Sequence, residues 1–141
     1  MVQLPQQQLA QWAMQHATRF MALIDIGDDF KKQQILTQVQ EVFEGRLVGN
    51  VFVYKLKKAG FLAQKLSQQA KSPVSKYAAR VFAQAVATAH MRGHAIVSAD
   101  YAVKVVNLLS PADIVAVRKE REKQMALAIK WQKSAEIEKK D

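Results

Sequence analysis

The sequence predicts an all-α protein, a compact single domain over residues 1–141 built as a bundle of five to six helices. Apolar residues recur every three to four positions through most of the chain, which is the spacing of one face of a helix. Pro5, Pro73 and Pro111 each stand directly before such a stretch, and proline suits the first helical turn. Half of the residues (50%) are hydrophobic, which is enough for a folded core.

Three helices are expected in the first half of the chain, over residues 5–24, 29–44 and 51–70. Residues 51–54 alone would suit a strand, but the helical spacing that follows them favours a helix. The side chains expected to face the core are Leu9, Trp12, Ala13, His16, Phe20 and Leu23, then Ile35, Val39, Val42 and Phe43, then Phe52, Leu56, Ala59, Ala63, Leu66 and Ala70.

The breaks between these helices carry short polar residues and glycines. Asp25, Asp28 and Asp29 lie before the second helix, where an aspartate can cap the first turn and interact favourably with the helix dipole. Gly45 and Gly49 mark the break before the third helix.

Three more helices are expected over residues 73–91, residues 94–108 and from residue 111 to beyond Trp131. Ser72 and Ser110 precede prolines at the starts of two of them and are suitable N-caps. The segment between residues 77 and 106 is rich in alanine, so we expect closely packed helices there.

The sixth helix is expected to be long and highly charged, with a frayed tail at residues 136–141. Glu120 and Glu122 lie among basic residues and are expected to make surface ion pairs. A narrow apolar stripe either closes the common core or serves in a homodimer; it consists of Ile114, Val117, Met125, Ala128 and Ile129, with Trp131 near its end.

The net charge of +9 belongs to the middle of the chain, because residues 46–104 hold ten basic residues and one acidic residue, Asp100. Such a surface attracts nucleic acid, an acidic protein surface or anionic lipid, although charge runs are often only solvated helix faces. The candidate partner-binding residues are Lys55, Lys58, Lys65, Arg80 and Arg92.

Nucleic-acid binding is the second interpretation of this charge. Lys55, Lys58 and Lys65 share one helix face and could contact phosphates. The neighbouring aromatic residues have core-like spacing, however, and are not expected to interleave with the charges as stacking platforms; they are Phe52, Phe61, Tyr77 and Phe82.

A metal site is a further alternative, centred on His90 and His94. Two histidines four residues apart on a helix can ligate one ion, but a third ligand would have to come from His16, Asp100 or another helix. His90 continues an apolar stripe, so a hydrogen-bonded packing role is favoured and no metal or cofactor is predicted.

Neither an enzyme nor a membrane protein is expected. No serine lies in a nucleophile elbow, no glycine-rich loop could hold phosphate, and cysteine is absent. The beginning of the sequence lacks the pattern of a secretory signal, and no apolar run approaches the roughly 20 residues that span a bilayer. A soluble, cytoplasmic protein is expected.

The order of four segments resembles the immunity-five-like family of immunity proteins, which genomic context associates with bacterial polymorphic toxin systems. The resemblance covers roughly residues 4–108, is most specific at residues 85–95, and extends loosely to residues 120–124. The segments read LAQWA at 9–13, FEGRL at 43–47, AARVFAQAVATAHMRGHA at 78–95 and YAVKVV at 101–106.

The resemblance implies an all-helical cytoplasmic protein that binds and neutralises a toxin, with no catalytic residues to carry over. This chain departs from the family at His16, where relatives often carry cysteine, and at Phe43, where they often carry tryptophan. Its lysine-rich middle would suit a toxin with an acidic surface and would fit poorly against a basic nuclease.

Overall fold

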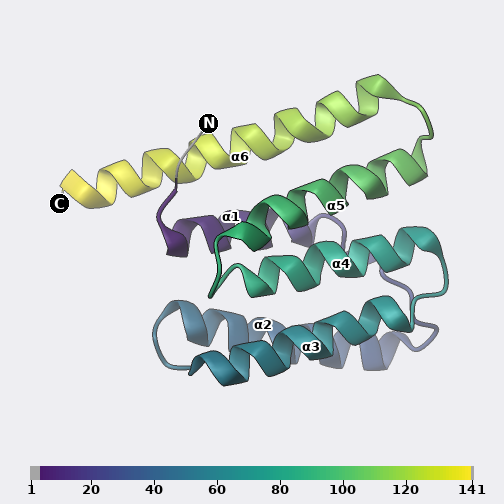
Figure 1. The fold of residues 1–141 in the computed structure, drawn as a ribbon, viewed down its shortest axis with the longest axis horizontal. Helices are drawn as coiled ribbons and strands as arrows, with labels where there is room; N and C mark the ends of the chain where they lie inside the picture. Colours follow the sequence, from purple (N-terminus) through teal and green to yellow (C-terminus); the bar gives the residue numbers. More distant parts are fainter. Residues whose placement is uncertain (1–3, 141) are drawn as a thin grey trace.

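The computed structural model describes residues 4–140, with side chains described as far as Lys133 (Figure 1). The all-α prediction is confirmed, since this part of the chain contains helices and no strand. The fraying expected at residues 136–141 falls outside the described side chains and stays a prediction. The elements are α1 (Gln6–Thr18), the 3-10 turn η1 (Met21–Leu23), α2 (Asp29–Leu47), α3 (Val53–Gln68), α4 (Pro73–Ala87), α5 (Gly93–Leu109) and α6 (Ile114–Lys140).

Helix α4 lies at the centre of the bundle. It packs between α3 and α5, and α1 lies against both α4 and α5. Four of its eight buried residues are alanines, which let neighbouring helix backbones approach closely. In addition, the Ser98 hydroxyl of α5 donates a hydrogen bond of 2.8 Å to the Val81 carbonyl of α4. The fully or almost fully buried residues of α4 are Ser75, Ala78, Ala79, Val81, Phe82, Ala83, Ala85 and Val86.

The predicted caps of α2 and α4 are confirmed. The Asp28 carboxylate accepts a hydrogen bond of 3.0 Å from the Lys31 backbone N–H, and the Ser72 hydroxyl accepts one of 3.1 Å from the Ser75 N–H. Each bond satisfies a backbone donor that has no partner within its own helix. These two residues therefore fix where α2 and α4 begin.

Several predicted boundaries are wrong. The first helix ends at Thr18 and not at residue 24, and the fourth ends at Ala87 and not at residue 91. Gly45 does not break the second helix, which continues to Leu47 and ends before Gly49, whose φ is +81°.

The sixth helix also begins later than predicted. Ala112 has a positive φ of 59°, so the chain turns after Pro111 and Ser110 cannot cap the helix. The Asp113 carboxylate caps it instead, because it accepts a hydrogen bond of 3.0 Å from the Ala116 N–H.

The apolar stripe of α6 closes the core only in part. Ala128 is buried and Trp131 packs against the core, whereas Ile114, Met125 and Ile129 are exposed by 73%, 49% and 41%. Polar groups also dock this helix. The Trp12 indole donates to the Gln124 carbonyl at 2.9 Å, and the Gln124 amide donates to the Ala99 carbonyl at 3.1 Å.

An ion pair between Arg19 and Glu120 strengthens this docking. Both guanidinium N–H groups bind the carboxylate, at 2.9 and 2.8 Å, and the Glu120 side chain is only 3% exposed. The expectation that Glu120 makes a surface ion pair is therefore wrong. Bidentate geometry and burial make this pair stronger than an exposed one.

We predict that Arg19→Met lowers the free energy of unfolding by about 3 kcal/mol, because Glu120 would stay buried without its counter-charge. The double variant Arg19→Met/Glu120→Met should recover part of this loss, since it removes the buried charge as well. Urea unfolding measures both values. A double variant less stable than the single one would contradict this account.

We predict that Gly60→Ala raises the free energy of unfolding by about 0.5–1 kcal/mol, because alanine favours a helix interior and its Cβ would meet no atom within 4 Å. Gly45→Ala is the matched control. Its Cβ would lie 2.6 Å from Cγ2 of Val51, so this change should destabilise the protein although it also lies within a helix. Thermal unfolding of the two variants compares them, and the same sign for both would refute the explanation.

Candidate protein-binding surface

Three of the five candidate partner-binding residues lie on the outer face of α3. Leu56, Ala59, Ala63 and Leu66 are buried on the inner face. Lys55, Lys58 and Lys65 are therefore left exposed on the other side. The Lys58 amine lies 5.7 Å from the centre of the Tyr54 ring, so a cation–π interaction helps to hold it.

Aromatic rings lie among these lysines, contrary to the sequence prediction. Phe52 and Phe61 were expected in the core but are exposed by 75% and 72%. Phe52 precedes the first residue of α3 and is extended (φ −72°, ψ 153°), so the helical period does not apply to it. Phe61 stands two residues from both Ala59 and Ala63, which places it on the opposite helix face. Of the other two aromatic residues, Phe82 is buried as predicted and Tyr77 is partly buried.

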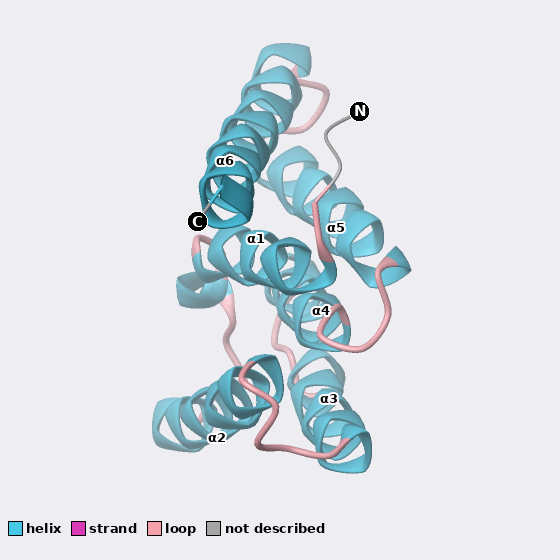
Figure 2. Cartoon of the chain, turned by 90° about the vertical axis from the view of Figure 1, so that its left-hand side faces the viewer, coloured by secondary structure: helices cyan, strands magenta, loops and turns pink. Residues whose placement is uncertain are grey.

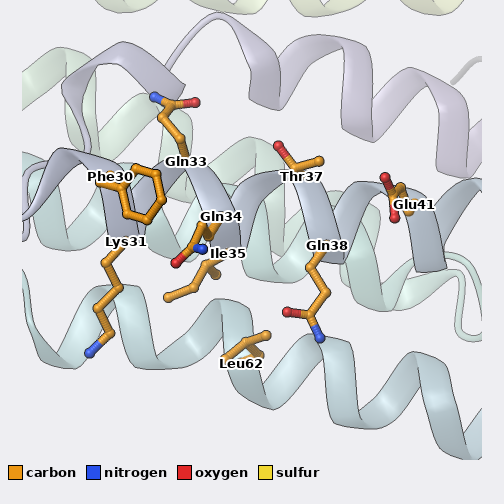
Figure 3. Close-up of a pocket in the computed structure, with 9 residues that line it drawn as sticks. All are labelled: Phe30, Lys31, Gln33, Gln34, Ile35, Thr37, Gln38, Glu41 and Leu62. Carbon is orange, nitrogen blue, oxygen red and sulfur yellow. The ribbon is translucent and has the colours of Figure 1, made fainter.

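A shallow groove runs between α2 and α3 (Figure 3). It consists of two adjoining hollows of about 670 and 420 Å³, which share Gln38 and Leu62. Figure 3 shows Ile35 and Gln38 projecting from α2 toward the helix that carries Leu62. We call this feature the α2–α3 groove; its lining residues are Phe30, Lys31, Gln33, Gln34, Ile35, Thr37, Gln38, Glu41, Val42, Lys55, Lys58, Ala59, Phe61, Leu62 and Lys65.

The lining of the α2–α3 groove combines positive charge with an apolar floor. Its basic residues are Lys31, Lys55, Lys58 and Lys65, and Glu41 is its single acidic residue. Lys55, Lys58 and Lys65 were predicted from the sequence as binding residues, whereas Lys31 and the groove itself were not. The position of Phe61 opposite the apolar stripe was the available signal, whereas the pairing of α2 with α3 required the fold.

Arg80 and Arg92, the other two candidates, do not line the groove. The Arg80 guanidinium lies 5.1 Å from the ring centre of Tyr77 and 5.8 Å from that of Tyr101, so it is engaged on α4 and α5. Arg92 is exposed in the turn before α5. The five residues therefore do not form one continuous site.

The structure places His90 and His94 side by side but brings no third ligand to them. Their ring centres are 5.8 Å apart, and Nδ1 of His94 lies 2.7 Å from the Gln84 side-chain oxygen. Burial lowers the pKa of His90, and the charges of His94 and Lys57 lower it further. Within the described part of the chain, no group of three histidine, cysteine or acidic residues could hold a metal ion. Asp100, one expected third ligand, pairs instead with Arg121 at 2.6 Å.

His16, the other expected ligand, belongs to the polar contact between α1 and α6. Its side chain is fully buried, stacks on Trp12 at 5.8 Å, and lies with Nδ1 2.7 Å from the Arg19 guanidinium. Because arginine can only donate, Nδ1 accepts and the ring proton lies on Nε2, which is buried.

The pKa of His16 is lowered to about 4. Burial is the largest cause and the charge of Arg19 the second, while the charge of Glu120 acts in the opposite direction. The ring is therefore neutral at pH 7, and its role is packing within the core.

We predict that stability falls as the pH is lowered from about 6.5 to about 4, because the unfolded chain takes up a proton that folded His16 excludes. The loss between pH 7 and pH 5 should be on the order of 2 kcal/mol. The charged groups that act on this ring are Arg19, directly after α1, and Glu120 and Arg121 of α6.

Urea unfolding at several pH values measures this dependence. His16→Gln should remove most of the slope, whereas His90→Gln should remove only the smaller part that the lowered pKa of His90 contributes. Parallel slopes for the wild type and His16→Gln would show that another group is responsible.

Comparisons with known proteins identify the family. In the described part of the chain, no helix is both long and apolar enough to cross a membrane. No curated protein and no solved structure matches the chain. The sequence profile of one family, described as Imm-5 like putative immunity protein, matches residues 1–130, and so nearly the whole chain. The protein therefore belongs to the Imm-5 like immunity protein family.

Proposed function

We propose that this protein is a non-catalytic, cytoplasmic immunity protein, which binds a protein toxin and blocks it by covering part of its surface. The observation that carries this proposal is the α2–α3 groove, with its apolar floor, exposed aromatic rings and excess of lysines. Family membership supports a protein partner of this kind.

The composition of the groove suits protein recognition. Exposed aromatic side chains such as Phe61 and Phe30 (72% and 74% exposed) supply large contact areas, and such residues are enriched among those that dominate binding energy. The surrounding lysines would attract an acidic surface over long range and favour the correct orientation. The expected partner therefore presents an acidic surface with apolar residues inside it.

The positions of the perturbed titratable groups support binding over catalysis. Among the described residues, the groups with a displaced pKa are His16, His90 and Glu120. His16 and Glu120 are sealed between α1 and α6, and none of the three lines the α2–α3 groove. Displaced pKa values gather at many active sites, and here they lie away from the exposed cleft.

Binding to single-stranded nucleic acid is the second candidate function. It is favoured by one observation, the exposure of Tyr54 and Phe61 among the lysines of α3, because bases stack on such rings while lysines contact phosphates. This function would make affinity fall steeply with salt concentration. A metal-dependent function receives no such support from His90 and His94.

We predict that the purified protein forms a stoichiometric complex with the protein encoded beside it in its source genome. Lys55→Glu/Lys58→Glu/Lys65→Glu should weaken this complex by about tenfold to a hundredfold, because it reverses the charge beside the groove. Calorimetry at near-physiological salt measures the affinity, and size-exclusion chromatography with light scattering gives the stoichiometry.

The matched control is Arg118→Glu/Lys119→Glu/Lys123→Glu, which changes the net charge equally on exposed residues of α6. This control should bind like the wild type. Equal losses in both triple variants would show that only net charge matters. Absence of a complex with the wild type, together with salt-sensitive binding to oligonucleotides, would favour the second candidate function.

A further inference from the structure

The α2–α3 groove is a shallow, open surface hollow that is long enough for one more helix to lie along it. It follows α2 from Phe30 to Val42, a length of about 18 Å at the helical rise per residue. Side chains of a third helix can pack into the furrow between two neighbouring helices, as ridges pack into grooves elsewhere in bundles. Figure 2 shows α2 and α3 at the end of the molecule opposite α6, so both helices are open to a partner there.

The backbone of the groove favours a helical occupant over an extended one. Both walls are α-helices, whose backbone groups are already paired within each helix apart from their ends. An extended peptide would find few backbone partners there and would leave its own N–H and C=O groups unsatisfied where it became buried. A helix pairs its own backbone and offers only side chains, which is also what the groove offers.

The charged and apolar residues of the groove determine which kind of helix could bind in it. Val42, Ala59 and Leu62 form an apolar strip between the lysine-bearing side of α3 and the amide-bearing side of α2. A nucleic acid would place phosphates over this strip, whereas apolar side chains would cover it without an unpaired polar group. Acidic residues beside the apolar face of the occupant would then meet the lysines of α3.

We propose that the α2–α3 groove receives an amphipathic, acidic α-helix of the partner protein, whose apolar face covers Val42 and Leu62 and whose carboxylates meet Lys55, Lys58 and Lys65. This inference rests on the proposed function, because it takes the partner to be a protein. It adds the secondary structure and the chemical pattern of the segment that is bound.

The first experiment titrates the full-length protein, labelled with 15N, with a synthetic helical peptide of about 14 residues. The peptide carries leucines on one face and glutamates beside them. We expect shifts of the backbone amides of Gln38, Val42 and Leu62, and none in the middle of α6. A scrambled peptide without an apolar face, a version with lysine in place of glutamate, and a short oligothymidine serve as comparisons.

Phe61→Glu tests the location of this binding, since Phe61 is 72% exposed and its replacement should not disturb the core. We expect this variant to bind the acidic peptide at least about tenfold more weakly. Met125→Glu is the matched control, because Met125 is also an exposed apolar residue on a helix (49% exposed), and it should bind like the wild type.

The outcomes separate this inference from the proposed function. The helix proposal is wrong if the scrambled or lysine peptide binds equally well, if oligothymidine binds the same residues more tightly, or if shifts appear only elsewhere. It is also wrong if the neighbouring protein binds the wild type and Phe61→Glu with equal affinity, although the proposed function would then stand. If the acidic peptide occupies the groove but the neighbouring protein does not bind, the proposed function fails while the groove's specificity for such a helix is supported.

Discussion

Close packing around α4 is the constraint on which the rest of the structure depends. This helix touches α1, α3 and α5, and it can do so because small residues cover most of its buried surface. Larger side chains at Ala79 or Ala85, both fully buried, would push at least one neighbour away. The position of α3, and with it the outward direction of its lysines, follows from this contact.

The two ends of the bundle are held in different ways. At one end, α1, α5 and α6 meet through hydrogen bonds and the Arg19–Glu120 ion pair, with His16 kept neutral between them. At the other end, α2 lies mainly on α3, and its buried apolar residues include Ile35 and Leu36. The displaced pKa values belong mostly to the first end and the exposed aromatic rings of α3 to the second, which is why the second end suits recognition.

The sequence predicted the helical class, and most of the side chains that it placed in the core of the first three helices are buried, because local spacing and capping residues carry that information. Asp28 and Ser72 show this, since each caps a helix within three residues of itself. Local spacing could not predict that Arg19 binds Glu120, because 101 residues separate them and only the fold brings them together.

The candidate site shows the same division. The exposure of Lys55 and Lys58 followed from helical periodicity, and the direction of Phe61 could have been read from the same period. The apolar floor of the groove depends on the pairing of α2 with α3. The sequence alone could not predict that Gln38 and Val42 would line the same hollow as Lys58. Arg80 was predicted to bind a partner because of its positive charge. Its guanidinium instead makes cation–π contacts with the rings of Tyr77 and Tyr101.

The polar docking of α6 also determines which part of the protein unfolds first. Among the described side chains of this helix, Leu127, Ala128 and Trp131 pack on the core, so separating α6 from α1 and α5 exposes less apolar surface than opening the whole bundle does. The α4 amides, by contrast, become accessible to solvent only when the whole bundle comes apart. Hydrogen exchange in the folded state would thus proceed through α6 as a local unit, while α3 and its lysines keep their arrangement.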